Sequence, residues 1–154
     1  MTDFNPALSS SSPSVLIASD HAGFDLRQLV LAEAPSLGLT FTDLGCEDKS
    51  SVDYPDYAHR LADQIAEGGL GILICGSGIG ISIAANRHAH IRAALCHNST
   101  DARLSRQHNN ANVLVLGART MGAEVALDCI RAFTSTAFEG GRHQRRLDKL
   151  SPSA

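Results

Sequence analysis

The chain has 154 residues, a length that suits one domain with a substantial core rather than several modules. Hydrophobic residues make up 44% and charged residues 19% of the chain, which excludes a disordered or fibrous protein. The net charge of -3 argues against a general nucleic-acid binder, and no apolar run approaches the ~20 residues of a membrane helix, so we expect a soluble protein that binds neither nucleic acid nor membrane.

The start of the chain and its cysteines favour a cytoplasmic, single-domain protein. Residues 1–13 include a Ser-rich stretch and lack the basic start and apolar core of a signal peptide, so we expect a disordered leader there. The four cysteines form no CxxC pair and are too sparse for a secreted disulfide framework, which predicts reduced thiols. One domain is therefore expected over residues 14–150.

Apolar runs and helical stripes alternate along this domain. Short apolar runs rich in β-branched residues predict buried strands, whereas apolar residues spaced three and four apart predict amphipathic helices. Such alternation requires right-handed crossovers and predicts a doubly wound, Rossmann-like α/β fold, in which a five-stranded parallel sheet forms the middle of a three-layer αβα sandwich. The predicted strands are 14–19, 39–44, 71–75, 91–95 and 113–116, and the predicted helices lie near 26–34, 55–66, 81–86, 99–110 and 126–133.

The glycine-rich turn after the third predicted strand is a candidate anion site. Gly76, Gly78 and Gly80 lie between this strand and a helix, where backbone N–H groups can approach a phosphate or oxyanion. Ile81 stands where the dinucleotide fingerprint needs its third glycine, and the lysine of a phosphate loop is missing, so a nucleotide is disfavoured. A purely structural tight turn remains the alternative.

Cys75 directly precedes that turn. The dipole of the following helix would favour the thiolate, so Cys75 is a candidate base or nucleophile. The alternative is a thiol that only fills space at the end of a strand, and Cys46, Cys96 and Cys129 keep that interpretation.

Histidines and an aspartate follow other predicted elements. Asp20 and His21 could be metal ligands, an acid/base pair, or a helix cap beside a surface histidine. His97 after the fourth strand and His108 at the end of the fourth helix are similarly open. Because the spacing of the seven histidines matches no zinc motif, no metal is predicted.

Three arginines suit a phosphorylated ligand. The guanidinium groups of Arg119, Arg142 and Arg146 can pair bidentately with a dianion, whereas Arg145 and Lys149 fit a solvated basic face. Residues 139–150 are rich in Arg and Lys and have few apolar positions, so we expect this segment to pack on a partner subunit.

The ordered series of motifs resembles the ribose-5-phosphate isomerases of the B type, a family that also holds galactose-6-phosphate isomerase subunits. The resemblance runs from Val15 to about Leu150. Its motifs are SDHAGF (19–24), DYPDYA (53–58), ILICGSGIGISIAANR (72–87), LSRQHNNANVLVLGAR (104–119) and EGGRHQRR (139–146).

The resemblance implies an aldose-ketose isomerase that needs no cofactor or metal and interconverts ribose 5-phosphate and ribulose 5-phosphate. It further implies a homodimer, or a dimer of dimers, with active sites at the subunit interface. Allose, galactose or tetrose phosphates are alternative substrates. A phosphosugar-binding module without catalysis, and a covalent thiol enzyme with His108 as base, are alternative functions.

The resemblance also implies residue roles. Cys75 would be the general base, and Ser77, where many relatives have Thr, would help to move a proton between the two oxygens. The amides of Gly76, Gly78 and Gly80 would stabilise the enediolate. The ring-opening pair would be Asp20 and His108, the sugar hydroxyls would contact Asn109 and Tyr54, and the phosphate would contact His21, Arg119, Arg142 and Arg146.

Overall fold

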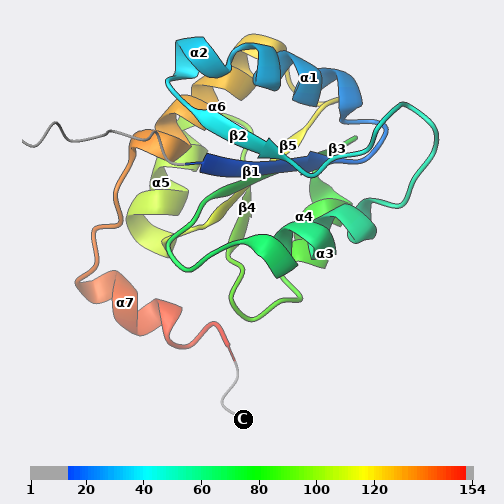
Figure 1. Cartoon of the computed structure of the whole chain (residues 1–154). Helices are drawn as coiled ribbons and strands as arrows, with labels where there is room; N and C mark the ends of the chain where they lie inside the picture. The colour runs from blue at the N-terminus through cyan, green and yellow to red at the C-terminus, as the bar shows by residue number, and fades with distance from the viewer. Residues whose placement is uncertain (1–13, 152–154) are drawn as a thin grey trace, which may run out of the picture.

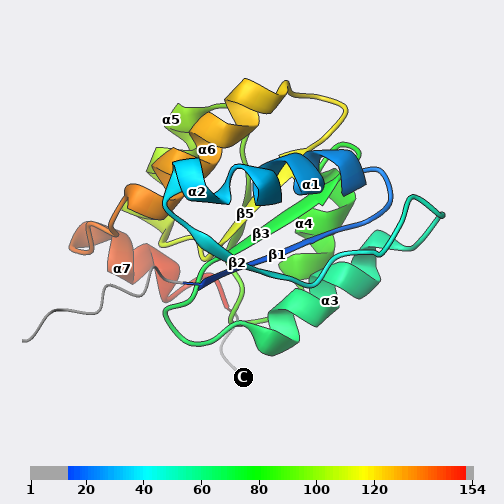
Figure 2. The same cartoon turned by 45° about the horizontal axis from the view of Figure 1, so that its top comes forward.

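The computed structural model describes residues 14–151 and contains a five-stranded sheet in which every strand pair is parallel. The strand order is β2-β1-β3-β5-β4, with helices on both faces of the sheet (Figure 1, Figure 2). The predicted doubly wound α/β fold is therefore confirmed. The predicted leader over residues 1–13 lies outside the described residues.

The elements follow one another in strict alternation over most of the chain. The strands are β1 (Ser14–Ser19), β2 (Thr40–Asp43), β3 (Gly71–Cys75), β4 (Ala93–Leu95) and β5 (Val113–Gly117). The helices are α1 (Phe24–Ala32), α2 (Ala34–Leu37), α3 (Tyr54–Gln64), α4 (Ile79–Ala85), α5 (Ser99–Asn109), α6 (Ala123–Ser135) and α7 (Arg142–Leu147).

Strand alternation divides the core into two apolar layers. Ile72 and Ile74 of β3 pack with residues of α1, α5 and α6, whereas Leu73 and Cys75 point to the opposite face, toward α3 and α4. All five residues of β3 are buried, as expected for a strand covered on both sides. The side chain of Cys75 therefore belongs to the α3/α4 face.

Two helix ends are fixed by local residues. Pro35 lies at the start of the short helix α2, and Gly38 ends that helix in the left-handed conformation, with φ of 66°. Asn98 caps α5, because its side chain accepts a hydrogen bond from the Asp101 N–H.

A buried arginine joins α1 to the sheet. Arg27 is 1% exposed and pairs with Asp43 at 3.2 Å, while its Nη1 donates to Ser19 Oγ at 2.6 Å and its Nη2 donates to the carbonyl of Cys46. Each contact links α1 to residues at or just beyond the end of β1 or β2. Removal of the guanidinium would leave the Asp43 carboxylate without its ion partner.

The C-terminal segment stands apart from the sheet. Figure 1 and Figure 2 show α7 beyond the end of α5, away from the three layers. Within residues 14–151, none of the helices combines the length and apolar character that a transmembrane span requires.

Candidate active site

The pocket that contains Cys75 lies where the sheet changes its direction of growth. The chain builds β2 on one side of β1 and then places β3 on the other side, so a crevice opens at the carboxyl ends of β1 and β3. This pocket has a volume of about 460 Å³. Its lining residues come from the ends of β1, β3 and β5 and from the starts of α3 and α4: Asp20, His21, Ala22, Tyr54, Cys75, Gly76, Ser77, Gly80, Arg119 and Thr120.

Cys75 is buried but reaches this pocket. It is 4% exposed, and its Sγ accepts a hydrogen bond from the Gly78 N–H at 3.2 Å. That N–H lies at the start of α4, where the helix dipole and the free amides favour negative charge. The sulfur therefore lies at the wall of the pocket beside a backbone N–H group, and its role as a base or nucleophile stays a prediction.

The glycine turn has one position that excludes other residues. Gly78 has φ of 80°, and a Cβ there would lie 2.5 Å from Leu95 Cδ1. Its conformation also turns the N–H toward the sulfur. Next to it, the Ser77 Oγ accepts from the Ile79 N–H at 3.2 Å, which holds the hydroxyl at the pocket wall.

The side chains of Arg119 and Tyr54 lie against glycines of the turn. A Cβ on Gly76 would lie 3.2 Å from Arg119 Nη1, so the guanidinium lies directly against this glycine, and the Arg119 N–H donates to the Gly76 carbonyl at 2.8 Å. The ring of Tyr54 lies against Gly80, where a Cβ would lie 2.5 Å from Cζ. Arg119 thus brings a positive charge beside the turn.

Asp20 and His21 occupy fixed positions at the end of β1. Asp20 is 5% exposed, and its Oδ1 accepts from the Gly23 N–H at 3.1 Å, which holds the carboxylate against the turn before α1 while it lines the pocket. Asp20 is not the cap of α1, because the N-cap of that helix is Gly23 and no side chain caps it. His21 Nδ1 accepts from the Val52 N–H at 3.1 Å. A neutral His21 ring therefore carries its proton on Nε2, which makes that nitrogen a hydrogen-bond donor.

Four predicted site residues lie outside the Cys75 pocket. Of the residues that the structure describes, His108, Asn109, Arg142 and Arg146 do not line the Cys75 pocket. Helix α5 runs back from β4 and ends at Asn109, shortly before β5 begins at Val113, whereas Cys75 pairs with Gly117 at the other end of β5. His108 and Asn109 are thus at the amino edge of the sheet.

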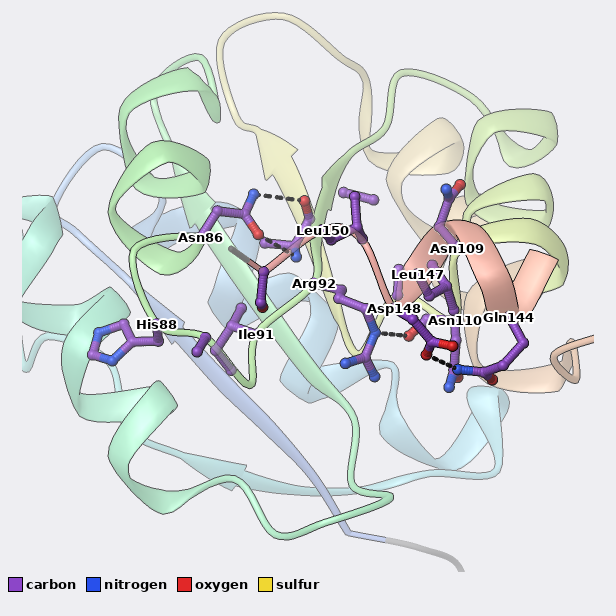
Figure 3. Close-up of a pocket in the computed structure, with 15 residues that line it drawn as sticks. Asn86, His88, Ile91, Arg92, Asn109, Asn110, Gln144, Leu147, Asp148 and Leu150 are labelled. Carbon is purple, nitrogen blue, oxygen red and sulfur yellow. Dashed lines mark hydrogen bonds between the residues drawn. The ribbon is translucent and has the colours of Figure 1, made fainter. Parts of the chain in front are cut away.

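A second hollow, of about 650 Å³, lies at that amino edge. It separates the edge strand β4 from α7, and Asn109 and Gln144 are among the residues that line it (Figure 3). Several of its polar groups are already engaged: Arg92 Nε donates to the Asn110 carbonyl at 2.7 Å, and Asn86 bonds to both the N–H and the carbonyl of Ala93. These contacts stabilise the loops of this edge.

The other thiols have ordinary structural roles. Burial raises the pKa of Cys96 to about 12 and that of Cys129 to about 11. Both thiols are therefore protonated at neutral pH. Cys46 lies beside the buried Arg27, whose Nη1 is 3.5 Å from its sulfur. All four cysteines are free, as predicted.

Among the polar residues that line the pocket, the sequence analysis missed Thr120. Thr120 follows Arg119 just beyond β5, and its Oγ1 lies 3.2 Å from the Gly117 carbonyl. Its place after an apolar strand was the signal that could have found it, because ligands bind at the carboxyl ends of parallel strands.

Comparisons with known proteins agree with this geometry. Residues 15–150 match the profile of the Ribose/Galactose Isomerase family. Ribose-5-phosphate isomerase B of Escherichia coli is 42% identical over 139 residues, which cover 89% of this chain and 93% of the relative.

The solved structures of ribose 5-phosphate isomerase B from Thermotoga maritima and from Anaplasma phagocytophilum each have 48% identity and a TM-score of 0.86. These two matches cover 90% and 91% of this chain, respectively, and 97% of each relative. The predicted resemblance is confirmed: the chain belongs to the ribose/galactose isomerase family and is an isomerase.

Proposed function

We propose that this chain interconverts ribose 5-phosphate and ribulose 5-phosphate through a cis-enediolate, with Cys75 as the general base. The observation that carries the proposal is the pocket itself. A sulfur that accepts an amide N–H, a glycine turn, a serine hydroxyl and an arginine all converge at the carboxyl ends of β1, β3 and β5. These are the groups that proton transfer next to a carbonyl requires.

The reaction needs a proton to leave carbon 2 of the open-chain aldose and to arrive at carbon 1. The thiolate of Cys75 takes the first proton, and the electron pair of the C–H bond moves into the enediolate. Amides of the glycine turn stabilise the negative oxygen, an effect worth roughly 10²–10³ in rate for each donor. The Ser77 hydroxyl moves a proton between the two oxygens, and Cys75 then returns its proton to carbon 1.

The remaining groups bind and open the sugar. Within one chain, His21 Nε2 and the Arg119 guanidinium are donors for the phosphate, and Tyr54 contacts sugar hydroxyls. Asp20 and His108 open the ring, Asn109 binds a sugar hydroxyl, and Arg142 and Arg146 complete the phosphate site. Phosphate binding far from the reacting carbons provides energy that orients the substrate.

We further propose that a second copy of the chain supplies the residues that the pocket lacks. Three observations support a homodimer with shared sites. His108 and Asn109 lie at the sheet edge opposite to Cys75, and α7, which carries Arg142 and Arg146, stands away from the sheet. Beside the glycine turn, Ile79 and Ile83 of α4 are 56% and 52% exposed and share one helix face, which offers an apolar surface for a partner.

A coupled isomerase assay across phosphorylated aldoses tests the proposed substrate. Ribose 5-phosphate should give the highest kcat/KM when it is compared with the 6-phosphates of allose and galactose and with a tetrose phosphate. Intact mass spectrometry during turnover should show no sugar adduct, because the thiol acts as a base and forms no bond to carbon. A stable adduct on Cys75 would favour the covalent thiol enzyme, and a lack of turnover with every sugar would favour a binding module.

A further inference from the structure

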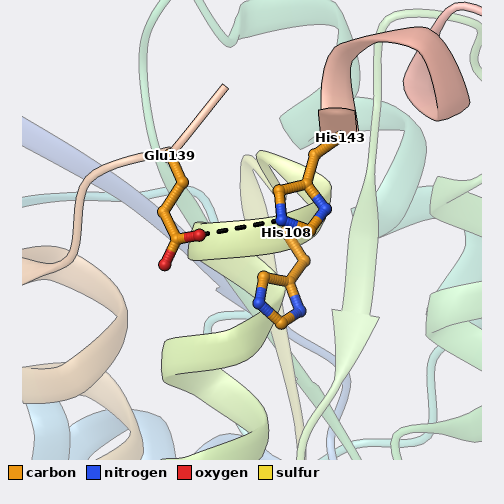
Figure 4. Close-up of side chains that lie close together, drawn as sticks. All are labelled: His108, Glu139 and His143. Atoms are coloured by element: carbon orange, nitrogen blue, oxygen red, sulfur yellow. Dashed lines mark ion pairs between the residues drawn. The ribbon is translucent and has the colours of Figure 1, made fainter. Parts of the chain in front are cut away.

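Three side chains outside the Cys75 pocket form a compact group of metal-binding type. His108 lies in the last turn of α5, Glu139 lies between α6 and α7, and His143 is the second residue of α7 (Figure 4). Each side chain offers one ligand atom, and these three atoms lie within 4.8 Å of one another. The two imidazole rings are stacked, with centroids 4.4 Å apart and planes 15° from parallel.

The hydrogen bonding of His143 points independently to a ligand for this group of side chains. The residue is 5% exposed, and its Nε2 finds no hydrogen-bond partner among residues 14–151. Glu139 Oε2 is 3.6 Å away from it, beyond normal hydrogen-bond distance. A buried ring nitrogen without a partner is costly, and Figure 4 shows this nitrogen facing the Glu139 carboxylate, with the His108 ring stacked against the His143 ring.

The backbone holds the three residues together in advance. The Glu139 N–H donates to the Gln107 carbonyl at 3.1 Å, which ties Glu139 to the last turn of α5 beside His108. The His143 N–H donates to the Gly140 carbonyl at 3.1 Å and closes the turn between Glu139 and α7. The Glu139 side chain is 49% exposed, so the group is open to solvent on one side.

We propose that His108, Glu139 and His143 bind a divalent transition-metal ion of the zinc class. Two imidazoles and one carboxylate are a donor set typical of zinc, with a fourth position left for water. Bond lengths of ~2.0–2.2 Å put neighbouring ligand atoms ~3.3–3.6 Å apart, so the side chains must move inward by about 1 Å. The two imidazole rings must also rotate out of their stacked arrangement, because each nitrogen coordinates an ion in the plane of its own ring. The exposed Glu139 side chain and the half-buried His108 ring have room for this movement.

A metal ion bound at this site regulates isomerase activity. This part of the proposal rests on the proposed function. A metal ion on His108 occupies the nitrogen that ring opening requires. Bound zinc therefore inhibits turnover of the cyclic sugar phosphate, and removal of the ion by a chelator restores it. Because inhibition depends on the role of His108 and binding does not, the two effects are separable.

Titration of the chelator-treated full chain with Zn²⁺ by calorimetry, and with Co²⁺ by visible absorption, tests the site. The intact chain should bind about one ion, and Co²⁺ should give the intense absorption of a four-coordinate site. Glu139→Gln should weaken binding at least tenfold, roughly the scale of a disturbed metal site, and His143→Gln should weaken it further. Circular dichroism checks that both variants are folded.

Two controls locate the ion. His59→Gln removes the other close histidine pair, in which His59 Nδ1 and His88 Nε2 are 2.7 Å apart, and should leave the affinity unchanged. Titration in a Cys75→Ala background excludes the reactive thiol as a ligand. Absence of saturable binding below about 100 µM Zn²⁺ would overturn the site, as would equal affinities for the wild type and Glu139→Gln.

The activity measurement separates the metal site from the proposed reaction. Zinc should inhibit the wild type, and a higher zinc concentration should be needed to inhibit Glu139→Gln. Binding at these three residues without inhibition would support the metal site and remove His108 from ring opening. A chain without isomerase activity would still report binding by calorimetry.

Discussion

Replacement of Cys75 by alanine removes the proposed base with little change to the fold. The side chain is 4% exposed, so the substitution deletes one buried sulfur and one accepted hydrogen bond, from Gly78. These losses together cost roughly 1–2 kcal/mol of folding stability. Loss of general-base catalysis should lower kcat by roughly 10²–10⁴, which corresponds to about 2.7–5.4 kcal/mol of barrier.

A coupled assay with ribose 5-phosphate over a range of concentrations separates the two effects. The kcat of Cys75→Ala should fall as calculated, while KM should change by less than about threefold because the phosphate contacts remain. Cys46→Ala is the matched control, since Cys46 is also 4% exposed and belongs to the same apolar layer but does not line the pocket. A Cys75→Ala enzyme with kcat within tenfold of the wild type would refute the assignment of the base.

Three further predictions follow from the structure. Asp20→Asn and Arg142→Ala should each be inactive alone and recover partial activity when mixed, and no recovery despite proven subunit exchange would contradict shared sites. Arg27→Ala should lower the free energy of unfolding by roughly 2–5 kcal/mol in urea titrations, because the substitution leaves a cavity and removes the buried donor of Ser19 Oγ and of the Cys46 carbonyl; a loss below about 1 kcal/mol would contradict that role. Iodoacetamide at pH 8 should modify Cys75 before Cys96, whose pKa of about 12 leaves roughly one thiolate in ten thousand, and ribose 5-phosphate should protect Cys75; equal rates of labelling would contradict this order.

The fold was predictable because its pattern is local. The strands other than β2 are apolar runs and each long helix carries an apolar stripe, so the two periods identify these elements within a few residues of their observed ends. The edge strand β2, with the sequence TFTD, is mostly polar. The pocket residues near Cys75 were predictable for the same reason, because parallel strands bring their carboxyl ends to one edge. Asp20 follows β1, Cys75 is the last residue of β3 and Arg119 lies just beyond β5, and these three strands are neighbours in the sheet.

The features that the sequence did not reveal depend on tertiary contacts between distant segments. Arg27 is one charged residue on an otherwise apolar helix face, and its partners belong to the ends of β1 and β2. His143 and Glu139 are more than 30 residues from His108, so no spacing rule joins them. The edge at which His108 lies was also misjudged, because its position after a predicted helix was grouped with the ends of strands.

The position of the reactive sulfur is dictated by the ladder of β3. This strand is hydrogen-bonded on both sides, with Ile74 opposite Ser19 of β1 and Cys75 opposite Gly117 of β5. Because all of its residues are buried, insertion or deletion of one residue would keep the strand apolar on both faces and would rotate the thiol into the layer of α1 and α6. A protein with such a shifted strand would keep its buried sheet and remain folded. It would lack the thiol in the pocket and would therefore have no isomerase activity.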